Sequence, residues 1–215
     1  FLCLLLGVLS VVSLFGKPLL VIPLAALAAG LVALRKYSGD ERPVGMRAAM
    51  VGMVFAVGFG SCGLFVSWFK TRTLGAQAEK FALDYIEVIA RGDDFYALEL
   101  GKDYVNRFPT TMDLNQHYAL SESGKEAVDE FKSQAMRQVI RSRGSGAIWV
   151  LDRPVNISYT RGRERAELML RDPTGETAAK IHIFLDYLID SRGNGQWHVE
   201  DCILETPLYT APAVL

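Results

Sequence analysis

The run of residues 46–69, MRAAMVGMVFAVGFGSCGLFVSWF, constrains the fold of this chain more than any other stretch. Between Arg47 and Lys70 it holds 22 residues without a charge. As an α-helix with a rise of about 1.5 Å per residue, those residues would extend for about 33 Å, which is enough to cross a hydrocarbon core of about 30 Å. We therefore expect a transmembrane helix here, preceded by membrane segments and followed by a domain that folds in water.

Two shorter apolar runs precede this helix, at residues 1–15 and 19–34, and the sequence Gly16-Lys17-Pro18 separates them. A single helix over both runs would be about 50 Å long, which exceeds the thickness of a bilayer. Because proline cannot continue a helix and glycine loosens it, a break at these residues predicts a hairpin of two short helices. We expect three membrane helices; two, with a kink in the first, is the alternative.

The charges that flank the helices predict their orientation. The loop at residues 35–47, RKYSGDERPVGMR, contains four basic residues. The positive-inside rule places this loop in the cytoplasm, so a single crossing by residues 46–69 places the C-terminal domain on the other side of the membrane. We therefore predict an integral membrane protein with an extracytoplasmic C-terminal domain.

Small residues recur every four positions along the long apolar helix, at Ala48, Gly52, Ala56 and Gly60. Such a stripe lets helix backbones approach closely, which is how membrane helices gain packing energy. The stripe predicts either packing within the chain or self-association of two chains. No acid, base or histidine interrupts the apolar helices, which argues against an ion or proton pathway through them.

The segment LLVIPLAALAAGLVALRKYSGDERPVGMRAAMVGMVFAVGFG resembles a bacterial family of small helical membrane modules of unknown function. In that family an apolar helix ends in a short, basic, glycine-rich loop, and a second helix rich in glycine and alanine follows. The resemblance covers about residues 1–68. It brings no known activity and no binding residues. We expect the transmembrane helical module to span residues 1–72.

The rest of the chain reads as a folded domain at residues 73–206 and a tail at residues 207–215. After Thr73 there are 16 basic and 22 acidic residues, and this acidic balance argues against nucleic acid as a partner. Helical spacing of apolar residues predicts helices at residues 74–90, 95–106 and 124–143, with a loop at residues 108–123. Alternation then predicts antiparallel strands at residues 147–151, 155–160, 165–171, 180–190 and 196–204. Helices followed by strands indicate an α+β fold.

Three segments of this domain, FALDYIEVIARGDDFYAL, AKIHIFLDYLID and GNGQWHVEDCILE, resemble the nuclear-transport-factor-two-like superfamily. This superfamily is an α+β cone shared with ketosteroid isomerases and many bacterial accessory domains. The resemblance covers about residues 75–205. It implies N-terminal helices packed on a curved antiparallel sheet, and a cone interior in which a buried acid can serve as a general base.

Four residues are candidates for lining a pocket in this cone: Asp186, Trp197, Asp201 and His182. Alternation along the last strand places Asp201 on the apolar face. There the resemblance to the superfamily implies a general base with a pKa raised by desolvation. The alternative is a structural carboxylate at the end of the sheet, bonded to backbone N–H groups or paired with an arginine. His182 and Asp186 share a strand face but lie about 13 Å apart, too far for direct contact. No nucleophile with an orienting group and no metal-ligand spacing is visible, so we predict no catalytic residues, no metal and no cofactor.

The features together predict a membrane-anchored, non-enzymatic binding or assembly module with an extracytoplasmic cone domain. Its expected partners are the lipid bilayer and membrane or envelope proteins. The alternative is an isomerase or hydrolase of the cone superfamily that acts on a small apolar substrate, with Asp201 or Asp186 as the base.

Overall fold

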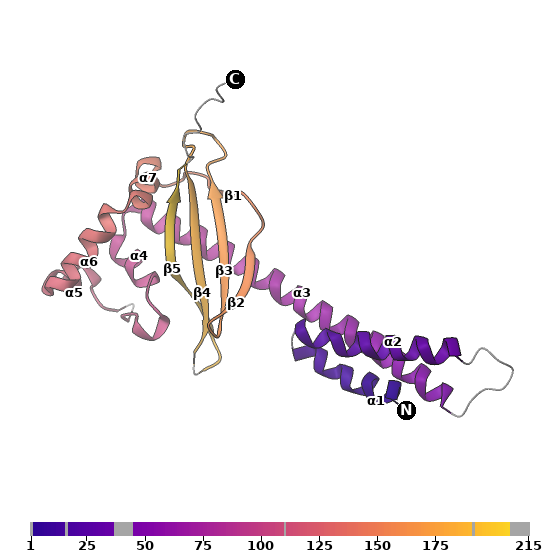
Figure 1. Cartoon of the computed structure of the whole chain (residues 1–215). Helices are drawn as coiled ribbons and strands as arrows, with labels where there is room; N and C mark the ends of the chain where they lie inside the picture. The colour runs from indigo at the N-terminus through magenta and orange to yellow at the C-terminus, as the bar shows by residue number, and fades with distance from the viewer. Residues whose placement is uncertain (1, 16, 37–44, 110, 191, 207–215) are drawn as a thin grey trace, which may run out of the picture. The chain divides into compact units, whose positions relative to one another are not determined.

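A computed structural model describes residues 2–15, 17–36, 45–109, 111–190 and 192–206 (Figure 1). The fold is α+β, as the order of helical and strand-like segments predicts. The chain divides into two compact units, Phe1–Thr73 and Leu74–Leu215. Most of the expected basic loop, at residues 37–44, and the tail at residues 207–215 lie outside the described residues.

In the first unit, helix α1 (Leu2–Leu9) continues as a 3₁₀-helix, η1 (Ser10–Phe15), and is followed by η2 (Lys17–Leu20) and α2 (Val21–Lys36). The helix α3 (Met46–Arg91) comes next and runs without interruption into the second unit. By length and composition, two helices could cross a membrane, within Pro18–Arg35 and Met46–Arg91, whereas the first apolar stretch, Leu2–Leu14, is shorter. The described residues therefore contain two helices of spanning length and, before the expected break at residues 16–18, one shorter apolar helix. The choice between three membrane helices and two stays a prediction.

The stripe of small residues on α3 packs against other segments of the same chain. A side chain on Gly52 would collide with the main-chain oxygen of Cys3, and one on Gly60 would come within 3.2 Å of Pro23. Ala56 between them is buried. This is the first of the two expected uses of the stripe, and self-association through it stays a prediction.

The part of α3 in the second unit ends where the sequence predicts. Gly92 has a φ of +91°, its N–H bonds to the carbonyl of Ile89, and the N–H of Asp93 bonds to the carbonyl of Val88. This pattern is a Schellman motif, which glycine favours because it has no Cβ to strain at a positive φ. The side chain of Asp93 then caps the next helix by accepting a hydrogen bond from the N–H of Tyr96.

The helices after this point differ in part from the expectation. Helix α4 (Asp94–Leu100) is shorter than expected, and a 3₁₀-turn, η3 (Tyr104–Asn106), follows it. Helix α5 (Leu114–Leu120) lies in the stretch expected to be loop, where Asp113 caps its first turn. The expected helix at residues 124–143 is two helices, α6 (Glu122–Ser133) and α7 (Ala135–Arg143), because Gln134 between them has an extended backbone.

The described residues form five strands in one antiparallel sheet, as predicted. They are β1 (Val150–Leu151), β2 (Asn156–Thr160), β3 (Arg163–Arg171), β4 (Lys180–Ile189) and β5 (Gly195–Glu205). The order is β1-β3-β4-β5, and β2 also pairs with β3. Arg161 and Gly162 join β2 to β3 with φ angles of 53° and 81°, which fits the type I′ turn of a two-residue hairpin.

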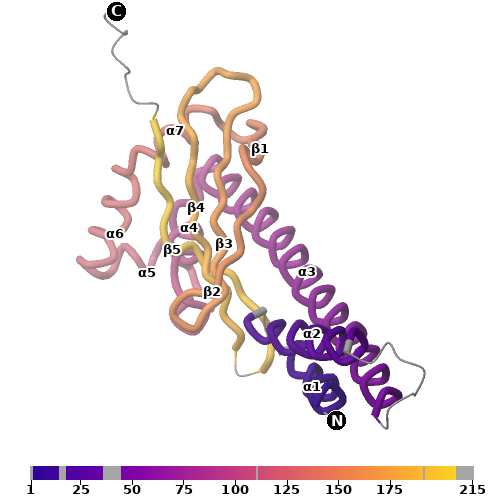
Figure 2. Tube along the Cα trace, turned by 45° about the vertical axis from the view of Figure 1, so that its right-hand side comes forward, coloured from indigo at the N-terminus to yellow at the C-terminus, as the bar shows by residue number. Residues whose placement is uncertain are grey.

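The second part of α3 lies across one face of this sheet, while α4 and α7 lie beside the edge strand β5 (Figures 1 and 2). The core between them is apolar and well buried. Its largest fully buried side chains are Ile89, Ile140, Leu168, Leu170, Ile181, Ile183 and Leu185. The opposite face of the sheet, which we call the outer face, carries charged side chains such as Arg165, Glu167 and Asp186.

A β-bulge in β5 overturns the expected position of Asp201. Phe184 of β4 pairs with Asp201, but Leu185 pairs with Val199, so Glu200 is an extra residue in β5. One extra residue reverses the alternation of side chains beyond it. Asp201 is therefore exposed on the outer face, and Cys202 packs against the core in its place.

Candidate functional site

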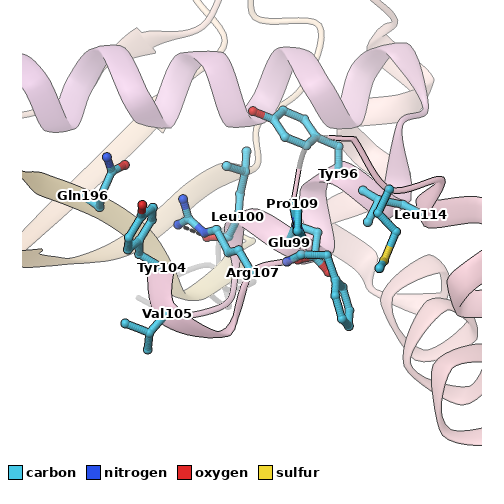
Figure 3. Close-up of a pocket in the computed structure, with 11 residues that line it drawn as sticks. Tyr96, Glu99, Leu100, Tyr104, Val105, Arg107, Pro109, Leu114 and Gln196 are labelled. Atoms are coloured by element: carbon cyan, nitrogen blue, oxygen red, sulfur yellow. Dashed lines mark hydrogen bonds between the residues drawn. The ribbon is translucent and has the colours of Figure 1, made fainter. Parts of the chain in front are cut away.

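A pocket of about 590 Å³ opens in the second unit, between α4, the segment that follows it and the start of β5. Its lining residues are mostly apolar or aromatic: Tyr96, Glu99, Leu100, Tyr104, Val105, Arg107, Phe108, Pro109, Met112, Leu114 and Gln196. In the view of Figure 3, Gln196 and Tyr104 lie at one end and Tyr96 and Leu114 at the other, with Arg107 and Glu99 between them. This volume is within the range of pockets that hold small ligands.

Helix-ending and helix-capping residues position the segments that form the walls of this pocket. The N–H of Gly101 closes α4 by bonding to the carbonyls of Ala97 and Leu98. The chain then turns through η3 to Pro109, which has no N–H to extend a helix. At the far side Asp113 starts α5, and the cap fixes Leu114 as the first residue of that helix.

The rim of the pocket exposes apolar surface. Four of its side chains are well exposed although they are large and apolar: Tyr96 at 44%, Tyr104 at 42%, Val105 at 79% and Met112 at 41%. Gathered apolar side chains of this kind make the rim a candidate surface for contact with another molecule. Single exposed apolar residues elsewhere on the domain carry no such meaning.

Glu99 is a buried carboxylate in the pocket wall, and its partners satisfy it fully. Its Oε1 accepts hydrogen bonds from Lys102 Nζ and from the Tyr118 hydroxyl, both at 2.6 Å, and its Oε2 accepts one from the N–H of Phe108 at 2.8 Å. Burial raises the pKa of Glu99, but these three hydrogen bonds outweigh it and hold the pKa below its usual range. Glu99 is thus ionised at neutral pH, which argues against a role as a general acid, and its three hydrogen bonds favour a structural role.

Arg107 carries the second charge of the pocket. Its Nε donates to the carbonyl of Lys102 at 3.0 Å, and its Nη2 donates to the carbonyls of Trp197 at 2.6 Å and Leu100 at 3.4 Å. Burial lowers the pKa of Arg107, yet an arginine keeps its proton in proteins. The pocket therefore offers apolar surface, one neutralised carboxylate and one fixed cation, a combination that suits binding.

Asp186, one of the predicted site residues, lies on the outer face of the sheet and not in this pocket. It is 4% exposed, and Arg165 holds both of its oxygens, with Nε at 2.6 Å and Nη2 at 3.0 Å. This bidentate pair makes Asp186 the counter-ion of Arg165. Such an arginine pair is the structural role that the sequence suggested for Asp201.

His182 also lies on the outer face, apart from Asp186. Its Nε2 lies 2.9 Å from Glu167 and its Nδ1 lies 3.1 Å from Glu205. The ring also packs against Phe184, with the ring centroids 4.3 Å apart. Two carboxylates and a ring thus fix the imidazole within the surface of the sheet.

The other two predicted site residues lie apart from each other. Trp197 is buried in the core, where its ring lies 4.9 Å from that of Tyr187. Asp201 is exposed and accepts a hydrogen bond from the N–H of its neighbour Cys202. The four residues therefore do not converge, although Gln196, next to Trp197, lines the pocket.

One group on the outer face brings possible metal ligands together. Asp186, His198 and Glu200 place one ligand atom each within 4.8 Å of the others. Arg165 already occupies both oxygens of Asp186, and the Nε2 of His198 lies 3.1 Å from Asp103. A cation would have to displace these partners, so the group is better explained as an ion-pair network.

Cys202 is not placed to act as a nucleophile with a histidine. Its side chain packs against the core, whereas His182 and Glu205 meet on the outer face. Burial raises the pKa of the Cys202 thiol, so the reactive thiolate is scarce at neutral pH.

The pocket residues were missed because they come from a weakly patterned stretch. Tyr104, Arg107 and Phe108 have no common period, and Gln196 joins them from another element. One signal was present: three aromatic residues and an arginine in 13 positions from Tyr96 to Phe108, without the alternation or the helical spacing of a core segment.

Comparison with known proteins adds no relative. No protein-family model, no curated protein sequence and no solved structure matches the chain.

Proposed function

We propose that this chain is a membrane-anchored, non-enzymatic binding module whose folded domain lies outside the cytoplasm and takes an apolar ligand into the pocket beside β5. One observation carries the proposal. The pocket of about 590 Å³ has an exposed apolar rim, whereas the buried carboxylate in its wall is already paired. A site of this kind favours holding a ligand over transforming it.

The distribution of side chains in the first unit supports the membrane anchor. Large apolar side chains such as Leu24, Val54 and Phe65 are 65%, 69% and 62% exposed, while Gly52 and Ala56 face inward. A water-soluble protein has the reverse pattern, because exposing such side chains to water is unfavourable. Lipid around α2 and the first part of α3 would cover this surface.

The orientation rests on the charges that flank these helices. Arg35 and Arg47 bound a loop rich in basic residues, which the positive-inside rule assigns to the cytoplasm. One crossing by α3 then carries the domain to the opposite side.

The cone architecture is part of the same proposal. A sheet of five antiparallel strands with helices on one face is compatible with the resemblance to the nuclear-transport-factor-two-like superfamily. The alternative function, a cone-superfamily isomerase or hydrolase, has less support because Arg165 holds Asp186 and because Asp201 is exposed.

The chain supplies its own reporters for a binding experiment. Of its six methionines, Met112 lines the pocket at 41% exposure, whereas Met136 and Met169 are 2% and 8% exposed. The full chain, labelled with ¹³C at the methionine methyl groups and held in lipid nanodiscs, would be screened by NMR against small aromatic and aliphatic compounds. We expect some of them to shift the Met112 signal in a saturable way while Met136 and Met169 stay unchanged.

Two outcomes contradict the proposal. If no compound moves Met112 at millimolar concentration, the pocket is not a ligand site. If every compound that moves Met112 moves all six methyl signals equally, the effect is partition into the lipid.

A further inference from the structure

We propose that the pocket recognises the carboxylate of an apolar ligand, and that Arg107 binds this carboxylate through its free Nη1 group. This inference rests on the proposed function, since it names the class of ligand for the same pocket. It follows from which charges in the pocket have partners and which do not.

Arg107 differs from the other partly buried arginines of the domain in its partners. Arg137 pairs with Asp94, Arg143 with Asp172, Arg163 with Asp103 and Arg165 with Asp186. Among the described residues Arg107 bonds only to main-chain carbonyl oxygens. Carbonyl oxygens satisfy its hydrogen bonds but do not neutralise its charge. Two acids, Glu99 and Asp103, act on Arg107 electrostatically, but each is paired with another cation, Lys102 and Arg163 respectively. The pocket therefore retains a positive charge.

Among the described lining residues the one acid, Glu99, does not supply the missing negative charge. Both oxygens of Glu99 are occupied, by Lys102 and Tyr118 on one side and by the N–H of Phe108 on the other. Glu99 and Lys102 also neutralise each other at 2.6 Å. A ligand with a negative group would therefore complete the charge balance of the pocket.

The donors of Arg107 can be counted. A guanidinium group has five N–H donors, one on Nε and two on each Nη. Nε donates to the main-chain carbonyl of Lys102, and Nη2 donates to those of Leu100 and Trp197. Nη1 has no partner among the described residues. Arg107 lies among the residues that line the pocket (Figure 3). Two N–H donors are thus available to a carboxylate.

The carbonyl contacts also fix the orientation of the guanidinium before a ligand arrives. They come from two separate parts of the chain, the end of α4 and the start of β5. A preorganised donor loses little conformational entropy on binding, so more of the interaction energy appears as affinity. A charge-assisted hydrogen bond to a carboxylate is also stronger than one between neutral groups.

The other lining residues favour an apolar group on the part of the ligand that does not carry the carboxylate. Tyr96, Tyr104, Val105, Met112 and Leu114 offer aromatic and aliphatic surface around the cation. A phenyl or short alkyl body would bury against these side chains while its carboxylate reaches Arg107. A cationic ligand of the same shape would meet an unneutralised guanidinium.

Three probes with one body and different charges test the inference. They are 3-phenylpropanoate, the neutral 3-phenylpropanamide and the cationic 3-phenylpropylamine. Each would be titrated into the ¹³C-methyl-labelled full chain in nanodiscs, with the Met112 signal as readout and Met136 as control. We expect the acid to bind at least tenfold more tightly than the amide, and the amine to bind more weakly still. The preference should also decrease with added salt.

The outcomes separate the two proposals. If acid and amide bind equally well, the carboxylate inference is wrong and the pocket remains a ligand site. If the amine binds best, the pocket prefers a positively charged ligand and the carboxylate inference is wrong. If none of the probes moves Met112 although other compounds do, the inference also fails.

Variants give a second test on a folded protein. Arg107→Gln should remove the preference for the acid over the amide, while the matched control Arg153→Gln should keep it, because Arg153 lies outside the pocket and pairs with Glu167. Unchanged Met136 and Met169 signals would establish that the variant is folded. If they change, the probe series on the unmodified chain alone decides the inference.

Discussion

The guanidinium of Arg107 donates a 2.6 Å hydrogen bond to the main-chain carbonyl of Trp197, 90 residues further along the chain. This bond attaches the segment after α4 to the edge strand β5, where Gln196 and Arg107 both line the pocket. The residue that holds the pocket wall in place is therefore the residue that gives the pocket its charge. Changes at Arg107 should affect stability and ligand preference together.

Arg107→Gln should loosen the pocket wall, because it removes the hydrogen bonds to the carbonyls of Leu100, Lys102 and Trp197. We expect a loss of about 2–3 kcal/mol in the free energy of unfolding, together with faster hydrogen exchange at residues 101–109. Arg153→Gln removes an exposed ion pair and should cost about 0.5 kcal/mol. Unaltered exchange at residues 101–109 in Arg107→Gln would show that these bonds do not hold the segment.

Glu99 should make the domain sensitive to acid. Its partners hold the pKa of Glu99 below the usual range in the folded chain, so its contribution to stability is complete above the unfolded-state pKa of about 4.3. That contribution should disappear as the pH falls from there through the lower pKa of the folded state. Glu99→Gln should therefore lose about 2 kcal/mol at pH 7, and the gap to the unmodified chain should narrow below about pH 4.

Thermal unfolding at a series of pH values in detergent would measure this gap. Glu126→Gln is a suitable control because Glu126 is exposed on α6, and it should follow the unmodified chain at every pH. A gap between Glu99→Gln and the unmodified chain that widens on acidification would contradict the lowered pKa of Glu99 in the folded state.

Gly52 and Gly58 should differ in their tolerance of the same substitution. In Gly52→Ala the new methyl group would collide with the main chain at Cys3, whereas nothing lies within 4 Å of a methyl group at Gly58. We expect Gly52→Ala to cost about 1–3 kcal/mol through overpacking and Gly58→Ala to be neutral within about 1 kcal/mol. Unfolding in detergent, followed by circular dichroism, would measure both. Equal effects would mean that the glycine stripe does not pack within the chain.

Asp186 and Asp201 test the bulge in β5. Asp186→Asn removes the charge that pairs with Arg165, and we expect a loss of about 2 kcal/mol in the free energy of unfolding. Asp201→Asn changes an exposed side chain and should remain within about 0.5 kcal/mol of the unmodified chain. Should Asp201→Asn prove the more damaging change, strict alternation along the last strand would be right and the bulge wrong.

The sequence predicted those features of the fold that have local causes. Gly92 ends α3 and Gly144 ends α7 because glycine readily takes the positive φ angles found there, of +91° and +76°. The strands and their antiparallel pairing followed from alternation and from turns such as Arg161-Gly162. Helix α5 could also have been predicted, since Asp113 and Ser121 cap successive helices, but its sequence lacks a clear apolar period.

Local sequence patterns could not predict the candidate site. The extra residue Glu200 shows no sign in the sequence, and it alone moves Asp201 from the core face to the outer face. Arg107 acquires its role from Trp197, which only the folded chain brings near. Alternation and helical spacing identify which residues are buried, but not which charge in a pocket is left unpaired.

The central claim is a binding domain that a membrane anchor holds outside the cytoplasm, and cysteine labelling tests it most directly. Val105→Cys places a thiol at the pocket rim, where the side chain is 79% exposed, in a chain with Cys62 and Cys202 changed to Ala. Bacterial spheroplasts that express this chain would be treated with a membrane-impermeant maleimide and their membranes then washed with alkaline carbonate. Ser38→Cys, in the basic loop, is the matched control.

We predict that position 105 is labelled in intact spheroplasts, that position 38 is labelled only after lysis, and that the labelled chain stays in the washed membranes. Labelling of position 105 only after lysis, or release of the chain by carbonate, would contradict the account.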